Sequence, residues 1–222
     1  MLSPTLFYDA LRAADIDFFT GVPDSLLKDF CAYVSDHAGK DENLIAANEG
    51  AAIALAAGHH LATGCCALVY MQNSGLGNAV NPLVSLADSD VYSIPMLIVV
   101  GWRGEPGKPD EPQHVKQGRT TLELLDCIGI AHELLPTDAD QARELVVRAT
   151  EYMRQKQSPF AIVVADGTFE KYGAVPESPD FEMRREDAVR GIATKIGKSA
   201  VIVATTGKTA RELFEYRAET GG

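Results

Sequence analysis

The sequence has no excess of basic residues and no long apolar run. It contains 31 Asp and Glu against 20 Lys and Arg, for a formal net charge of −11. An acidic surface argues against nucleic acid or an anionic membrane as the main partner. The longest apolar runs, such as IPMLIVVG, are far too short to span a bilayer. The N-terminal stretch MLSPTLFYDALRAA lacks a basic segment and predicts an amphipathic helix, so we expect a cytoplasmic protein without a signal peptide.

Cysteine is scarce, and no paired-cysteine motif occurs. The four cysteines are Cys31, Cys65, Cys66 and Cys127. In a chain of this size they predict reduced, buried thiols. Cys65 and Cys66 fall in an expected strand, where neighbouring side chains point to opposite faces, so we expect no zinc site there.

Common catalytic and nucleotide-binding motifs are also missing. GKT at 207–209 would need a glycine five residues earlier, where Ile202 stands. GLGNAV at 75–80 lacks the third glycine of a dinucleotide-binding turn. His59 and His60 point about 100° apart on an expected helix, so they cannot grip one metal ion together.

The sequence does contain a regular alternation of apolar runs and helical patterns. The expected strands are Ile16–Thr20, Leu44–Ala47, Cys65–Met71, Pro95–Val100, Gly129–Leu134 and Phe160–Ala165. Helical spacing of apolar residues separates them, for example after a cap at Asp24 or Ser25 and over residues 138–156. Near-continuous apolar strands that alternate with helices predict an α/β fold with a doubly wound parallel sheet of six strands.

The alternation breaks near residue 169. Glycine, proline and charged residues predict a linker over 169–183 after a first domain over 1–168. Residues 184–222 then predict one helix–strand–helix unit, with SAVIVAT as the strand. One strand and two helices cannot close a sheet. This tail therefore packs on the first domain or begins a second domain that the chain does not contain.

Polar residues follow four of the expected strands. The segments are TGVPDS, NEGAA, QNSGLGN and GWRGEPGKPDEPQHVKQG, the last taken as a long loop. Each has a structural explanation, since Asp24 and Asn48 suit helix caps and Asn73 and Gly75 suit turns. Ligands of open parallel sheets bind at the carboxyl ends of the strands, so the four segments together predict a site.

Long motifs in the same segments carry a family resemblance. They are GVPDS, ANEGAAIALAAGHHLATG, VYMQNSGLGNAVNPL, GWRGEPGKPDEPQHVKQG and TTGKTARELFEYR. They resemble the thiamine diphosphate-dependent decarboxylases that act on phosphonopyruvate and, more loosely, the related sulfopyruvate decarboxylases. The resemblance implies a pyrimidine-binding (PYR) domain over 1–168 and the first unit of a truncated diphosphate-binding (PP) domain over 184–222.

The resemblance places Glu49 against N1′ of the cofactor's aminopyrimidine. A carboxyl group there favours the imino form of the ring, which takes a proton from the thiazolium carbon C2. The thiazolium then absorbs the electron pair left by CO₂. The alternative is that Glu49 merely favours the first turn of a helix. The resemblance also implies cofactor contacts from Pro23, Gln72 and Asn73.

Two further roles follow from the same resemblance. His114 matches a histidine that handles the substrate carboxylate or delivers a proton, which suits a side chain titrating near neutral pH. The expected substrate end comprises Asp24, Ser25, Arg103, Glu111 and Gln113. Arg103 is expected to contact the phosphonate, because a forked cation suits such a group. The alternative is a solvated loop arginine.

The family's Mg²⁺-binding motif, Gly-Asp-Gly followed by asparagines, is missing. Its nearest match, ADGTF, has Ala165 in place of the first glycine, and no asparagine follows Asn81. Asp166–Gly167 therefore predicts a turn. We expect thiamine diphosphate as cofactor, with the Mg²⁺ ligands in the missing PP domain and little activity from this chain alone.

The expected function is that of the N-terminal portion of a decarboxylase that converts 3-phosphonopyruvate to phosphonoacetaldehyde and CO₂. Facing PYR and PP domains would require a homo-oligomer, dimer or higher, or a separate PP-domain chain. Two alternatives stay open: a sulfopyruvate decarboxylase α-type subunit, or a PYR-fold interaction module without catalysis. The tail SAVIVATTGKTARELF favours a piece of a longer chain over a natural subunit.

Overall fold

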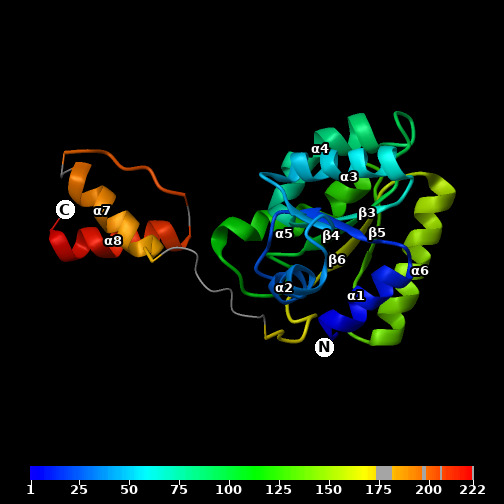
Figure 1. Cartoon of the computed structure of the whole chain (residues 1–222), viewed down its shortest axis with the longest axis horizontal. Helices are drawn as coiled ribbons and strands as arrows, with labels where there is room; N and C mark the ends of the chain where they lie inside the picture. Colours follow the sequence, from blue (N-terminus) through cyan, green and yellow to red (C-terminus); the bar gives the residue numbers. More distant parts are fainter. Residues whose placement is uncertain (174–181, 197–198, 206, 222) are drawn as a thin grey trace. The chain divides into compact units, whose positions relative to one another are not determined.

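The computed structural model describes residues 1–173, 182–196, 199–205 and 207–221 (Figure 1). The chain divides into two compact units, Met1–Val175 and Pro176–Gly222. The division falls within the linker expected over 169–183, of which 174–181 lie outside the described residues. None of the described helices combines the length and apolar character needed to cross a membrane.

The first unit is built on a six-stranded sheet in which all neighbouring strands are parallel. The strand order is β2-β1-β3-β4-β6-β5. The strands are β1 Phe18–Gly21, β2 Asn43–Ile45, β3 Ala67–Gln72, β4 Met96–Gly101, β5 Ala131–Leu134 and β6 Phe160–Val164. The predicted parallel sheet is confirmed, and every strand lies close to its expected position.

Helices cover both faces of this sheet (Figure 1). One face carries α1 Pro4–Ala13, α2 Lys28–His37 and α6 Ala139–Lys156. The other carries α3 Glu49–Thr63, α4 Leu76–Pro82 and α5 Pro112–Cys127. Along β3, Leu68 and Tyr70 join the first core while Val69 and Met71 join the second. Burial on both faces explains why the central strands β3, β4 and β6 are almost wholly apolar.

The start of α2 differs from the sequence-based expectation. The helix begins at Lys28, and neither Asp24 nor Ser25 caps it. The Asp24 carboxylate instead accepts the N–H of Leu26 (2.9 Å) in a turn that precedes the helix. A short polar side chain often bonds the backbone two residues ahead in this way, and the turn delays the helix.

The supposed long loop after β4 is a second difference. α5 begins at Pro112, so only residues 102–111 form a loop. Proline suits the first helical turn because its missing N–H would have no partner there. Gly118 lowers the helix propensity of this segment, so the sequence does not indicate the helix clearly. A glycine is needed there for packing, because a Cβ would fall 1.7 Å from the Gly104 carbonyl oxygen.

The four cysteines are free, but only Cys31 is buried. Cys65 and Cys127 are exposed and Cys66 is half-buried, so the expectation of four buried thiols is wrong. Cys65 and Cys66 precede β3 rather than lie within it. Strand alternation therefore does not direct them to opposite faces, and both border one pocket of about 390 Å³.

The second unit contains α7 Arg185–Ile196 and α8 Lys208–Thr220, and no residue of either helix is buried. The strand expected between them is wrong: the described residues 199–205 form none, and Val201 and Val203 are 91% and 92% exposed. Within the described part of this unit, no neighbouring strand binds the N–H and C=O groups of that segment. Apolar, β-branched residues alone do not make a strand without such pairing.

Candidate functional site

Polar segments meet at the edge of the sheet where the parallel strands end. β1, β3, β4 and β6 are consecutive neighbours, so the segments that follow them lie side by side. Backbone hydrogen bonds join them to the adjacent strands, from the Val22 N–H to the Tyr70 carbonyl (3.0 Å) and from the Trp102 N–H to the Val164 carbonyl (2.8 Å). This edge brings together residues that are up to about 140 positions apart in the chain.

Glu49 is the first residue of α3 and is half-buried. The helix begins there because the Asn48 side chain accepts the N–H of Ala51 (2.9 Å). Glu49 Oε2 accepts a hydrogen bond from Asn78 Nδ2 (3.1 Å). The carboxylate lies against Gly75, where a Cβ would fall 2.4 Å from Oε1. Among the described residues Oε1 has no hydrogen-bond partner.

Gln72 and Pro23 lie at the same edge. Gln72 ends β3, and its half-buried amide donates to Ser74 Oγ (2.7 Å). Pro23 is exposed just after β1. Their contact with a cofactor stays a prediction.

Asn73 directly follows β3. It is fully buried. Its Nδ2 donates to the Arg103 carbonyl and to Thr121 Oγ1, both at 2.8 Å, and its Oδ1 accepts the Arg103 N–H (3.2 Å). Its own carbonyl accepts Gln117 Nε2 (3.0 Å). The Asn73 side chain therefore ties the end of β3 to the loop after β4 and to α5. Its contact with a cofactor stays a prediction.

Asp24 is buried at the end of β1. Its carboxylate covers the end of β4, where a Cβ on Gly101 would fall 2.2 Å from Oδ2. Burial raises the pKa of Asp24, while backbone N–H groups, first that of Leu26, and the charge of Arg103 oppose the rise. The neighbouring Ser25 is exposed, and its hydroxyl accepts a hydrogen bond from Arg103 Nη1 (2.9 Å).

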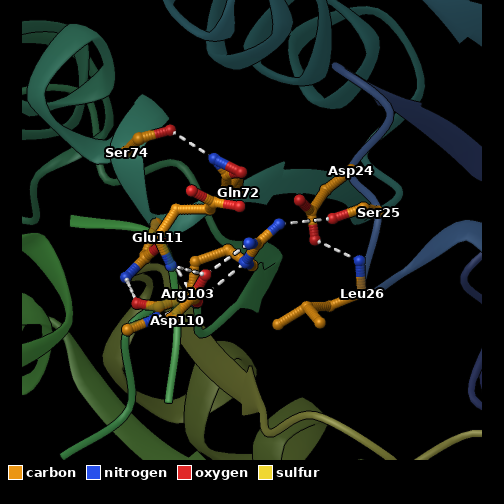
Figure 2. A network of polar contacts seen from close by, with 10 residues as sticks. Asp24, Ser25, Leu26, Gln72, Ser74, Arg103, Asp110 and Glu111 are labelled. Atoms are coloured by element: carbon orange, nitrogen blue, oxygen red, sulfur yellow. Dashed lines mark hydrogen bonds and ion pairs between the residues drawn. The ribbon is translucent and has the colours of Figure 1, made fainter. Parts of the chain in front are cut away.

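Arg103 and Asp110 form a two-point ion pair in the loop after β4, as Figure 2 shows. Arg103 Nε donates to Asp110 Oδ2 (2.9 Å), and Arg103 Nη2 donates to Oδ1. The Asp110 carboxylate also accepts the N–H groups of Gly104 and Glu111, each at 2.7 Å. These bonds, first the one from Arg103, hold the pKa of Asp110 well below its ordinary value. Arg103 is therefore held in place and is not a freely solvated loop arginine.

The other three predicted residues surround the start of α5. Glu111 immediately precedes the helix and accepts the His114 N–H at its carbonyl (2.9 Å). Glu111 and Gln113 are exposed and His114 is half-buried. The His114 carbonyl packs on Gly104, where a Cβ would fall 2.0 Å from it. The structure therefore places Gln113 and His114 on a helix rather than on the expected loop, with Glu111 at the end of the loop.

A pocket of about 250 Å³ lies beside Arg103. Trp102 lines it, and its charged lining residues are Arg103, Glu105, Lys108, Asp110 and Asp166. Lys108 Nζ lies 2.7 Å from Glu105 Oε2. The turn predicted at Asp166–Gly167 is confirmed, whereas Lys108 and Asp110 were not among the predicted site residues. Both follow a central strand, so they would have been found if every charged residue after such a strand had been taken as a candidate site residue.

Comparisons with known proteins identify the family of this chain. Residues 4–124 match the family described as "Thiamine pyrophosphate enzyme, N-terminal TPP binding domain". The chain is 32% identical to "Phosphonopyruvate decarboxylase" of Streptomyces hygroscopicus, over 96% of this chain and 56% of that protein. It is 33% identical to "Sulfopyruvate decarboxylase subunit alpha" of Methanocaldococcus jannaschii, over 70% of this chain and 89% of that protein.

The fold is shared with larger enzymes of known structure. Benzoylformate decarboxylase from Polynucleobacter necessarius superposes with a TM-score of 0.60 at 21% identity, over 88% of this chain and 36% of that chain. The chain spans about half the length of the phosphonopyruvate decarboxylases that it matches, 56% and 54% of the two. It belongs to the thiamine pyrophosphate enzymes and carries their N-terminal TPP binding domain.

Proposed function

We propose that this chain supplies the Glu49-bearing side of the active site of a decarboxylase that converts 3-phosphonopyruvate to phosphonoacetaldehyde and CO₂. One observation carries the proposal. Glu49 stands at the strand-end edge with one carboxylate oxygen unbonded by the described residues, inside the segment that matches the family. The name and 32% identity of the Streptomyces hygroscopicus relative support this substrate.

The described residues fit one end of thiamine diphosphate. Glu49 Oε1 can accept a hydrogen bond from a ring N–H, and the missing side chain of Gly75 leaves room for the carboxylate. They do not fit the diphosphate–metal end, because no group of three His, Cys, Asp or Glu in the described part of the chain is placed to hold a metal ion. We therefore assign Mg²⁺ to a PP domain.

When bound, the cofactor supplies the thiazolium ring that takes up the electron pair left by CO₂. Glu49 holds or releases a proton at Oε1, and Asn78 fixes the carboxylate through Oε2. Arg103, with Ser25, binds the acidic end of the substrate. His114, at the start of α5, delivers a proton to the product.

Most of the PP domain would come from outside this chain. Residues 184–222 would be its first unit, with the remainder in a longer chain, or a separate PP-domain chain would complete the site. In either arrangement the working enzyme is a homo-oligomer of at least two chains or a hetero-oligomer. Exposed apolar residues such as Ile45 and Leu61, 65% and 67% exposed, are compatible with further contacts.

One observation favours a second candidate, a sulfopyruvate decarboxylase α-type subunit. The α subunit of Methanocaldococcus jannaschii matches over 89% of its own length but only 70% of this chain. The first unit here thus has the size of a subunit that is a complete protein in that organism. The PP half would then be a separate chain.

The test combines this chain with a PP-domain polypeptide, thiamine diphosphate and Mg²⁺ and measures CO₂ release from phosphonopyruvate, sulfopyruvate and pyruvate. We expect release from phosphonopyruvate and a loss of about 100-fold or more in Glu49→Gln. Glu144→Gln, on the exposed surface of α6, is the matched control and should keep full activity. Release that is indifferent to Glu49→Gln would favour a non-catalytic interaction module, and preference for sulfopyruvate would favour the α-type subunit.

A further inference from the structure

The side chain of Arg103 is immobilised along one edge. Asp110 accepts hydrogen bonds from Arg103 Nε and Nη2 and from two backbone N–H groups, those of Gly104 and Glu111. Four bonds fill the acceptor capacity of a carboxylate. The contacts of Asp110 therefore all serve to hold the loop and the guanidinium.

The backbone of Arg103 is fixed as well. The fully buried Asn73 amide binds both its carbonyl (2.8 Å) and its N–H (3.2 Å). Asn73, at the end of β3, thus holds the main chain of Arg103, and Asp110, in the same loop as Arg103, holds its side chain. A residue fixed at both points presents its remaining donors in one orientation, which is the requirement for a preorganised binding group.

Arg103 is one of the residues that line the pocket of about 250 Å³. A guanidinium has five N–H bonds. Two go to Asp110 and one to Ser25, which leaves two without a partner among the described residues. Lys108 lines the same pocket but is paired with Glu105 (2.7 Å). The pocket therefore contains one oriented cation and one cation that is neutralised by its neighbour.

We propose that Asp110 and Asn73 are positioning residues that aim Arg103 at a tetrahedral acid group, and that Glu105 competes with that group for Lys108. The inference rests on the proposed function for the identity of the acid, a phosphonate. Loss of the negative charge of Asp110 weakens anion binding, because Arg103 loses its orientation, whereas loss of the Glu105 charge strengthens it, because Lys108 is released. A simple charge effect would strengthen binding in both cases.

The full 222-residue chain suits a direct binding test without cofactor. Trp102 is the single tryptophan and lines the pocket, so its fluorescence reports on the ligand. The probe is methylphosphonate, with acetate at equal ionic strength as the control anion. We expect saturable binding that Asp110→Asn weakens about tenfold or more and Glu105→Gln tightens by about threefold. Arg103→Lys, which keeps the charge but loses the fork, should also lose about tenfold.

Folding is checked by circular dichroism for each variant. If Asp110→Asn does not fold, Asp110→Ser keeps an acceptor for the backbone N–H groups while breaking the pair with Arg103, and it gives the same test. The proposal is overturned if the Asp110 variant binds methylphosphonate as tightly as the wild type or more tightly. It is also overturned if acetate binds the wild type as tightly as methylphosphonate does. In the complete enzyme the same variant should raise KM for phosphonopyruvate more than it lowers kcat.

The two proposals fail in different ways. Binding of methylphosphonate with the expected order of variants, but no CO₂ release from the completed enzyme, overturns only the proposed function. CO₂ release that depends on Glu49, with a KM unaffected by Asp110→Asn, overturns only the positioning of Arg103.

Discussion

Glu49 and Gly75 touch: the carboxylate fills the space that any side chain at position 75 would need. A Cβ there would fall 2.4 to 2.6 Å from the carboxylate oxygen and the two carbons beside it. Gly75 has no unusual backbone angle to justify a glycine. Its reason is therefore the carboxylate, whose place it determines together with the hydrogen bond from Asn78.

Gly75→Ala should displace the Glu49 carboxylate without unfolding the protein, because the end of a flexible side chain can move at little cost. We expect the free energy of unfolding to change by less than about 1 kcal/mol. Activity of the completed enzyme should fall by up to about 100-fold, since a misplacement of about 1 Å can cost that much. Urea unfolding and CO₂ release measure the two effects.

Gly77→Ala is the matched control, because Gly77 lies two residues after Gly75, inside α4. A Cβ there meets nothing within 4 Å, so activity should be retained. Stability should rise slightly, by up to about 1 kcal/mol, because alanine suits a helix better. Full activity in Gly75→Ala would contradict the role assigned to the contact.

Gly118→Ala should destabilise the fold itself. Its Cβ would fall 1.7 Å from the carbonyl oxygen of Gly104, and backbone cannot move aside as a side chain end can. Alanine gains about 1 kcal/mol in helix propensity, but overpacking costs about 1–3 kcal/mol or more. We expect a net loss of stability in chemical unfolding, and an unchanged midpoint would show that the loop 102–111 can shift freely.

Asp24 and Asp110 should affect stability with opposite pH dependence. Burial raises the pKa of Asp24 in the folded protein. The stability that this group contributes is therefore present below the pKa of an unfolded Asp, about 3.9, and is lost as pH rises through the folded pKa. Asp24→Asn should therefore gain stability relative to wild type as pH rises from about 3 to 7. The measurement is urea unfolding across this range.

Asp110 is the counterpart in the same experiment. Its pKa is lowered, first by the bond from Arg103, so its contribution is present above about pH 3.9 and is lost as pH falls through the folded pKa. Asp110→Asn should be less stable than wild type at pH 7, with the difference shrinking in acid. The same pH trend in both variants would show that the environments of the two carboxyl groups are wrongly assigned.

The cysteines should react in two classes. Cys65 and Cys127 are exposed, whereas Cys31 is buried and its pKa is raised to about 12, first by burial. At pH 8 the thiolate fraction of Cys31 is on the order of 1000-fold below that of an ordinary thiol. Iodoacetamide followed by peptide mass spectrometry should label Cys65 and Cys127 in the folded chain and Cys31 only in denaturant. Early labelling of Cys31 would contradict its burial.

The helices α7 and α8 should exchange their amide hydrogens quickly, because no residue of either is buried. Ion pairs such as Arg185–Glu212 (2.6 Å) are exposed and contribute little. Hydrogen-exchange mass spectrometry should show far less protection there than in α6, whose apolar side is buried. A PP-domain partner should raise the protection, and protection equal to that of α6 in the isolated chain would contradict the expectation.

Much of the first unit is readable from the sequence, because its signals are local. Residues 160–164 are continuously apolar, and that strand is buried throughout. Asp138 caps α6, whose acidic first turn and basic last turn match the helix dipole. The strand expected over SAVIVAT shows the limit of this reasoning, because a strand exists only through pairing with another.

The sequence by itself determined the alternation of strands and helices, the parallel sheet and the presence of an acid at the start of α3, since periodicity and caps act over a few residues. Only the tertiary structure decided that the buried Asn73 side chain binds the backbone of Arg103 and that Asp110 pairs with the Arg103 guanidinium. Those contacts join loops that topology brings together, and no local pattern records which polar group will find which partner.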